Sequence, residues 1–214
     1  MKKIAFLGDS ITEGCGASEI DRRYTTVLCR DIGAVELNYG IGGTRIAPYI
    51  GEGGNPAFAE YFALRAKKID LSADFLFVFG GTNDYGHGNA PFGKSVDTDP
   101  HTFCGALRGL TEYLTDKFGR EKICFILPLH RYDENNEYGD GYPNSKRPIL
   151  QVYKDQIARC AESFGIDRLS LDKEFPEPKT IPSELTADGL HPNDKGHAIL
   201  AEHLKLYLKN KGVV

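Results

Sequence analysis

Short, uninterrupted apolar runs alternate along this chain with longer stretches whose apolar residues recur at helical spacing. A run of four or five apolar residues is typical of a strand buried on both faces, and amphipathic stretches are typical of the helices that cover such strands. The expected strands are residues 3–7, 35–38, 75–79, 123–127 and 168–171. The expected helices are residues 24–31, 56–68, 102–118, 148–164 and 193–209. The pattern therefore predicts an α/β protein of five β-α units with a parallel sheet.

The charge of the chain argues against a protein that binds nucleic acid. Its 214 residues include 30 acidic and 26 basic side chains, which gives a net charge of −4. The basic residues occur singly or in pairs such as Lys67-Lys68, whereas a groove that follows a phosphate backbone needs clustered lysine and arginine. No proline- or glycine-rich tract divides the chain, so we expect one domain that covers residues 1–214.

Neither a membrane span nor an export signal is expected. The longest apolar runs, residues 75–79 and 123–127, have five residues each, whereas a membrane-spanning helix requires about 20. The first apolar stretch ends at Gly8, which makes it too short for the core of a signal peptide. The five cysteines form no C-x-x-C pair, and we interpret them as reduced thiols of a cytoplasmic protein.

Glycine-rich turns with small polar residues follow the first three expected strands, at residues 8–12, 40–44 and 80–84. A fourth polar segment, residues 188–193, precedes the last expected helix. All strands of an open parallel sheet end at the same edge, so the segments that follow them gather in one crevice. Residues 85–100 and 131–147 show no periodicity, and we expect them to be long loops that wall this crevice.

The polar side chains of these segments meet the requirements of acyl transfer, which needs a nucleophile, a base, a carboxylate that orients the base, and donors for the oxyanion. Ser10 lies where a strand turns into a helix-like segment and is the candidate nucleophile. His191 is the candidate base, and Asp188 is the carboxylate that would orient it. The N–H groups of Ser10 and Gly43 and the side-chain amide of Asn83 are the candidate oxyanion donors. This chemistry requires no metal ion and no organic cofactor.

The motifs Gly8-Asp9-Ser10 and Asp188-x-x-His191, with glycine and asparagine blocks between them, resemble the SGNH hydrolase superfamily, the GDSL-type esterases and lipases. The resemblance extends over nearly the whole chain. It implies that Ser10 is the nucleophile, that Gly43 and Asn83 supply oxyanion donors, and that the last motif supplies the base and its carboxylate.

The same resemblance implies a three-layer α/β/α, flavodoxin-like fold in which the first strand lies between the second and the third. The glycine of the second block could align with either Gly42 or Gly43, because the two are adjacent. The spacing from Asn38 to Thr44 favours Gly43.

Taken alone, each motif also fits a purely structural role. Aspartate and serine are common helix caps, so the segment at Asp9 and Ser10 also fits a capped turn. A mononuclear metal site made of Asp9, Asn83, Asp188 and His191 is disfavoured, because it contains a single histidine and leaves the serine without a role.

Another motif points to a different class of protein. From Gly88 to Ser95 the sequence satisfies G-x-x-x-x-G-K-S, the pattern of a phosphate-binding loop in nucleotide-binding proteins. That loop has to connect a strand directly to a helix. The preceding expected strand ends at Phe79, and Ser95 leads into the polar residues 96–100, so this alternative lacks its structural context.

The expected partner is a small-molecule ester. The loop of residues 131–147 carries Tyr132, Tyr138 and Tyr142 among Asp, Asn and Gly, a composition that suits stacking on a sugar or another polar alcohol. Neither long loop is apolar enough for a lipase lid. We therefore predict short acyl chains, acetyl first, on a small soluble alcohol such as a carbohydrate. A lysophospholipase or thioesterase-type acyl hydrolase of the same fold is the alternative.

Overall fold

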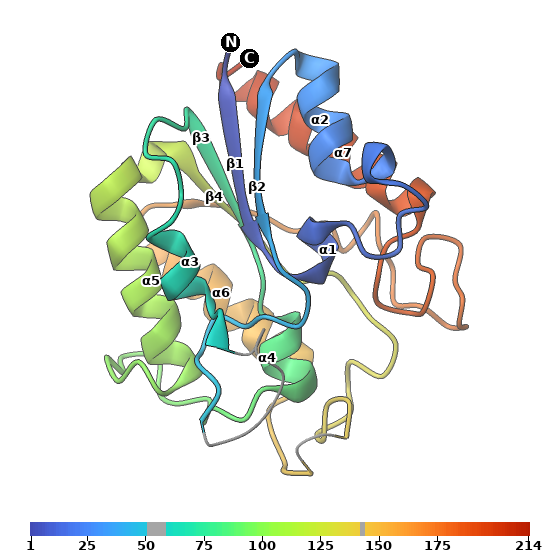
Figure 1. Ribbon diagram of the computed structural model, residues 1–214. Helices are drawn as coiled ribbons and strands as arrows, with labels where there is room; N and C mark the ends of the chain where they lie inside the picture. The colour runs from blue at the N-terminus through green and yellow to red at the C-terminus, as the bar shows by residue number, and fades with distance from the viewer. Residues whose placement is uncertain (51–58, 142–143) are drawn as a thin grey trace.

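The computed structural model describes residues 1–50, 59–141 and 144–214. Five parallel strands form one sheet in the order β2-β1-β3-β4-β5 (Figure 1). The strands are β1 (Lys3–Gly8), β2 (Val35–Gly40), β3 (Phe75–Phe79), β4 (Ile123–Ile126) and β5 (Asp167–Leu169). The prediction of a five-stranded parallel sheet, with the first strand between the second and the third, is confirmed.

Successive residues of the central strands point to opposite faces of the sheet and build two separate cores. In β1, Ala5 and Leu7 pack into one core, and Ile4 and Phe6 pack into the other. Strand β3 divides between the two cores in the same way. Because both faces are covered, these strands are continuously apolar instead of alternating between apolar and polar residues.

Helices cover both faces of the sheet (Figure 1). One face is covered by α3 (Phe62–Ala66), α5 (Phe103–Phe118) and α6 (Leu150–Ser163), and the other by α2 (Tyr24–Ile32) and α7 (Asp194–Asn210). Two short helices, α1 (Ser10–Glu13) and α4 (Thr82–His87), lie at the carboxyl ends of the strands. The arrangement is the expected three-layer α/β/α fold. Within the described residues, no helix is both long and apolar enough to cross a membrane.

The extent of the helix expected at residues 56–68 was wrong. Its first residues, 56–58, lie outside the described part of the chain, and the helix that follows, α3, covers only Phe62–Ala66. Tyr61 has an extended backbone, and the Phe62 N–H donates a hydrogen bond to the Arg45 carbonyl at 2.9 Å. This contact with the loop after β2 fixes where the helix begins.

The loop expected at residues 85–100 was also partly wrong, because α4 continues from Thr82 through His87. Most of this helix is buried through polar or small residues, so it has no apolar periodicity for the sequence to reveal. Residues 131–141 form no helix or strand, as expected for the second long loop. Tyr142 lies outside the described residues.

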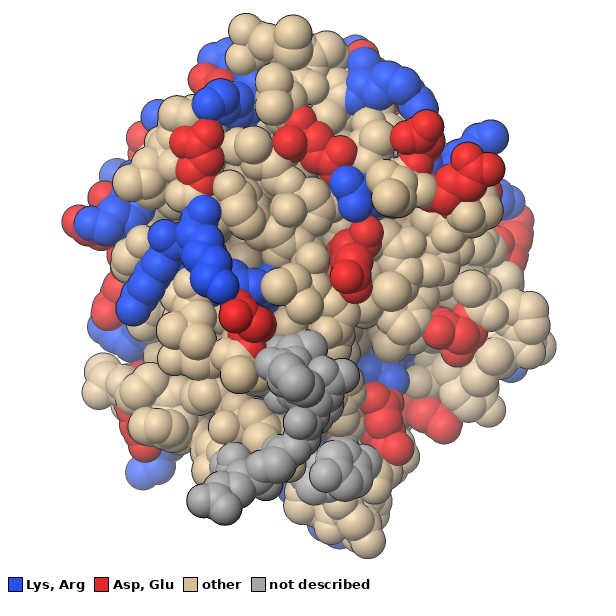
Figure 2. Space-filling view, in the orientation of Figure 1, with Lys and Arg blue, Asp and Glu red and all other residues tan. Residues whose placement is uncertain are grey.

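The carboxyl ends of the strands define one edge of the molecule. The chain segments that follow β1, β2 and β3 meet there with the loop of residues 131–141 and the segment before α7 (Figure 1). Acidic and basic side chains are interspersed over the face that Figure 2 shows. All the candidate catalytic residues predicted from the sequence lie at this edge.

Candidate active site

Ser10 is the first residue of α1, directly beyond the carboxyl end of β1. Asp9 caps this helix, because its side chain accepts a hydrogen bond from the Ile11 N–H at 3.1 Å. Gly8 has no room for a side chain, since a Cβ atom there would lie 1.9 Å from Thr12 Oγ1. The tight turn places the Ser10 side chain at the edge of the sheet, where it retains 6% exposure.

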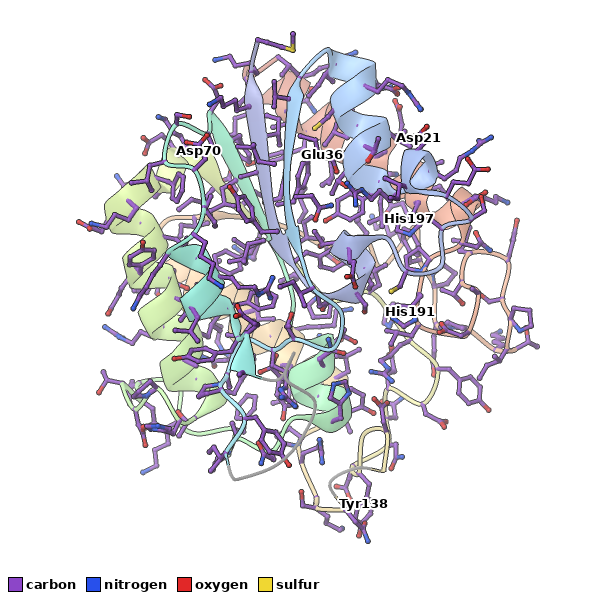
Figure 3. The ribbon with its side chains drawn as sticks, in the orientation of Figure 1. Asp21, Glu36, Asp70, Tyr138, His191 and His197 are labelled. Carbon is purple, nitrogen blue, oxygen red and sulfur yellow. The ribbon has the colours of Figure 1, made fainter. Side chains whose placement is uncertain are left out.

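Hydrogen bonds join Ser10, His191 and Asp188 in one chain. His191 Nε2 lies 2.9 Å from Ser10 Oγ, and His191 Nδ1 lies 2.7 Å from Asp188 Oδ2. His191 lies close to α1 in Figure 3, although 181 residues separate it from the serine. In this geometry the imidazole can accept the hydroxyl proton while the carboxylate fixes its tautomer.

The turn that carries Asp188 and His191 is held by its own backbone. Asp188 Oδ1 accepts hydrogen bonds from the N–H groups of Leu190 at 3.0 Å and His191 at 2.7 Å. Gly189, between them, has a φ of +83°, which glycine adopts without strain. Partial burial alone would raise the pKa of Asp188, but the hydrogen bonds from His191 and from the turn hold it below its ordinary value. An ionised carboxylate therefore faces the imidazole.

The loop after β2 passes close to Ser10. A Cβ atom added to Gly42 would lie 3.7 Å from Ser10 Cβ. The Gly42 N–H donates to Glu13 Oε2 at 2.9 Å, whereas no described residue accepts a hydrogen bond from the Gly43 N–H. Of the two adjacent glycines, Gly43 thus has the N–H group that remains available to an oxyanion.

Asn83, the second residue of α4, contacts the same loop. Its Nδ2 donates a hydrogen bond to the Thr44 carbonyl at 2.9 Å, and the second hydrogen of that amide remains to be donated. The side chain is buried. The structure therefore brings two of the candidate oxyanion donors, Gly43 and Asn83, together, since Thr44 directly follows Gly43 in the chain.

Arg65 supports this arrangement, and the sequence analysis did not identify it. Its guanidinium donates hydrogen bonds to the Gly8 carbonyl at 2.8 Å and to Thr44 Oγ1 at 2.6 Å, and it also contacts the Tyr39 carbonyl. Burial lowers the pKa of Arg65 to about 10, which leaves it charged. The available signal was an arginine three residues after Phe62, on the apolar side of an expected helix.

His197 also supports the site from within the core. Its Nδ1 accepts a hydrogen bond from the Tyr24 N–H at 3.3 Å, so its Nε2–H donates to the Cys15 carbonyl at 3.2 Å. These bonds tie α7 to the segment that follows Ser10. The signal in the sequence was a histidine in register with Leu200 and Leu204 on the apolar face of the last helix.

The carboxyl groups of Asp9 and Asp84 are buried beneath the site. The Asp84 carboxylate accepts hydrogen bonds from the N–H groups of Ile46 at 3.0 Å and Ala47 at 2.9 Å, which braces the loop after β2. Burial raises the pKa of Asp84 to about 6, although the two backbone hydrogen bonds oppose this shift. Burial likewise raises the pKa of Asp9 to about 6.

We expect Asp84→Asn to remove part of the pH dependence of stability. Because the folded-state pKa lies above the unfolded value, the stability contributed by protonated Asp84 is present at low pH and is lost as pH rises through about 6. Between pH 4.5 and 7.5, the unfolding free energy of the wild type should fall by about 2 kcal/mol more than that of the variant. Urea unfolding at the two pH values measures this difference, and equal pH dependence in both proteins would contradict it.

The two alternative kinds of site gain no support from the structure. The motif from Gly88 to Ser95 follows helix α4 instead of a strand, and a helix next begins at Phe103. It therefore lacks the strand-to-helix setting of a phosphate-binding loop. The described residues contain no group of three His, Cys, Asp or Glu side chains placed to hold a metal ion.

The family model for the GDSL-like Lipase/Acylhydrolase family matches residues 6–199. The chain belongs to this family of acyl hydrolases and esterases, within the SGNH hydrolase superfamily, as the motifs predicted. A comparison with curated proteins finds no match.

Solved structures share the fold over almost their whole length. A protein from Lactobacillus plantarum is 30% identical with a TM-score of 0.80, and the match covers 98% of this chain and 97% of that one. An acetyl xylan esterase is 24% identical with a TM-score of 0.67, over 97% and 98% of the two chains. A carbohydrate acetylesterase family member from Sinorhizobium meliloti is 15% identical with a TM-score of 0.64, over 100% of both chains.

Proposed function

We propose that this protein is a serine esterase that works through an acyl-enzyme. The observation that carries the proposal is the continuous hydrogen-bond chain from Ser10 Oγ through the His191 imidazole to Asp188. Gly43 and Asn83, with the Ser10 amide, are the donors proposed for the oxyanion.

The proposed reaction has two halves. Ser10 Oγ attacks the ester carbonyl while His191 Nε2 takes the hydroxyl proton, and the same proton then goes to the departing alcohol oxygen. In the second half, His191 takes a proton from water, the resulting hydroxide attacks the acyl-enzyme, and the acid leaves as Ser10 recovers its proton. Asp188 stabilises the imidazolium that forms in each half.

We propose short acyl chains, acetyl first, on a small soluble alcohol such as a carbohydrate. The loop of residues 131–147 that follows β4 is polar, with tyrosines set among Asp, Asn and Gly, so it offers no continuous apolar surface to a long chain. Two proteins that share the fold are named for acetylated carbohydrates, an acetyl xylan esterase and a carbohydrate acetylesterase family member. At their identities this likeness shows the fold alone, so the substrate proposal rests on the loop.

The acyl preference can be measured with p-nitrophenyl esters of acetate, butyrate, octanoate and palmitate. Because the polar loop of residues 131–147 gives the longer chains no continuous apolar surface to contact, kcat/KM is expected to fall by about tenfold or more from acetate to octanoate. Faster hydrolysis of palmitate than of acetate would contradict the proposal and favour a lysophospholipase or thioesterase-type enzyme. If none of these esters is hydrolysed, the proposal that the protein is an esterase is contradicted.

We further propose a cytoplasmic, reducing environment. All five cysteines are free thiols, four of them buried and Cys15 exposed. Burial raises the pKa of the Cys29 thiol to about 12, which keeps it protonated and unreactive. Free thiols are typical of proteins in reducing compartments.

A further inference from the structure

A cavity of about 280 Å³ lies beside the turn that carries Asp188 and His191. One wall is the loop of residues 131–141, and the other is formed by Ile181 and by Asp188–Leu190. The loop, marked by Tyr138 near its far end in Figure 3, extends away from the neighbourhood of His191. The volume is close to the lower limit of about 300 Å³ for small-molecule sites, so the cavity fits one ring-sized group.

Asp133, in the wall of this cavity, has an unusual backbone conformation and a free side chain. Its φ is +57°, and it is the only residue other than glycine with a positive φ among those the structure describes. The Tyr85 hydroxyl donates to its carbonyl at 2.6 Å, which holds the backbone in place. No described residue donates a hydrogen bond to its carboxylate. Asp133 is exposed, so its carboxylate is open to the cavity and can accept hydrogen bonds from a ligand that enters there.

The remaining lining determines which ligand fits. Two of the charged groups in the lining have a charged or basic partner, since Arg131 pairs with Asp140 and Asp188 faces His191. The carboxylate of Asp133 has no such partner among the described residues. An anionic headgroup would be repelled. Tyr132 and Ile181 are 41% and 54% exposed at the rim, and a tyrosine ring beside a free acceptor suits an apolar ring face that also carries hydroxyl groups.

The cavity adjoins the turn that presents His191, because its lining includes Asp188, Gly189 and Leu190, the residue directly before His191. His191 donates its proton to the departing oxygen, so the alcohol half of the ester has to lie next to this histidine. The cavity wall and the catalytic turn are joined directly, because the Tyr132 N–H donates to the Gly189 carbonyl at 2.8 Å. The candidate oxyanion donors come from other segments, which are α1, the loop after β2 and α4.

We propose that this cavity binds the alcohol half of the substrate, and that the alcohol is a neutral polyhydroxylated ring such as a monosaccharide unit. The Asp133 carboxylate accepts hydrogen bonds from its hydroxyl groups, and Tyr132 packs against its ring. This inference rests on the proposed esterase function, for which it assigns the determinants of alcohol specificity.

The test compares two acetyl esters that differ in their alcohol, 6-O-acetylglucose and p-nitrophenyl acetate, with the variants Asp133→Gly, Asp133→Asn and Tyr132→Ala. Loss of a hydrogen bond to a charged group predicts that Asp133→Gly lowers kcat/KM for the sugar ester by roughly ten- to a hundredfold, through KM. Hydrolysis of p-nitrophenyl acetate should stay within about twofold. Asp133→Asn retains an acceptor and should lose less.

Asp133→Gly also separates binding from a purely structural role. Glycine adopts positive φ without strain, so a residue that only shapes the loop would give a variant with a raised Tm and unchanged kinetics. That result would overturn the proposal. Equal losses on both esters would overturn it as well, because they would place the defect in the chemistry and not in alcohol binding.

Binding separates this inference from the esterase proposal. If no acetyl ester is hydrolysed, the esterase proposal fails, while binding of methyl glucoside to the protein, measured by saturation-transfer NMR and weakened by Asp133→Gly, still supports the cavity. Active protein that hydrolyses p-nitrophenyl acetate but neither binds the glucoside nor prefers the sugar ester overturns the cavity assignment. Faster, Asp133-dependent turnover of acetylcholine would also overturn it in favour of a cationic alcohol.

Discussion

Replacing Ser10 by alanine is expected to lower kcat for p-nitrophenyl acetate by about 10⁶-fold. The substitution removes the only oxygen that lies within hydrogen-bond distance of His191 Nε2 among the described residues, so no acyl-enzyme can form. The rest of the site would remain, because Asp9 and the N–H of Ile11 hold the turn independently of the hydroxyl.

Labelling shows whether the lost oxygen is the nucleophile. A fluorophosphonate probe should modify the wild-type protein on the peptide that contains Ser10 and should leave the Ser10→Ala variant unlabelled. Ser18→Ala is a matched control, since Ser18 lies in the segment that follows and its hydroxyl donates to Asp194 at 2.7 Å on the surface. Full activity of Ser10→Ala, or a label on another residue, would refute the proposed mechanism.

The fold could be predicted because the central strands β1, β3 and β4 are buried on both faces and each long helix on one. Those two environments produce different periodicities, so β3 and α5 were both located within a residue of their observed ends. Elements stabilised by polar contacts show no such periodicity in the sequence. Helix α4 is buried through Thr82, Asn83 and Asp84, whose hydrogen bonds and packing depend on neighbours distant in the chain.

The candidate site could be predicted to the extent that its chemistry is local. The spacing of Asp188 and His191 fits one turn, and Ser10 follows a strand directly, so the sheet topology alone brings them to the same edge. The supporting residues are different. Arg65 holds the carbonyl of Gly8 through a contact that spans 57 residues, and a sequence without the tertiary structure contains no information on that pairing.

The hydrogen bonds made by Arg65 and Asp84 explain how a polar site can be held in place. Arg65 and Asp84 occupy the hydrogen-bonding groups of the loops after β1 and β2, so few buried backbone groups there are left without a partner. The N–H of Gly43 is an exception. A donor left free in an otherwise satisfied loop is what electrostatic stabilisation of an oxyanion requires, because it needs no reorganisation during the reaction.

Asp188→Asn is expected to lower kcat by about 10⁴-fold while the fold is retained. An asparagine oxygen can still accept the N–H groups of Leu190 and His191 that hold the turn. The amide nitrogen then faces His191 Nδ1 and donates to it, which moves the imidazole hydrogen to Nε2. In that tautomer the histidine cannot accept the proton of Ser10.

Asp194→Asn is the matched control for this substitution. It makes the same change of charge three residues after His191, in a side chain that contacts Ser18 on the surface, and it should leave kcat within about twofold. The measurement is kcat for p-nitrophenyl acetate across pH 6 to 10, together with the Tm of each variant. Raised pH should partly restore Asp188→Asn, because hydroxide can replace the lost base, whereas a variant that merely misfolds would not recover. A stable Asp188→Asn protein with kcat within about tenfold of the wild type would show that Asp188 does not orient the base.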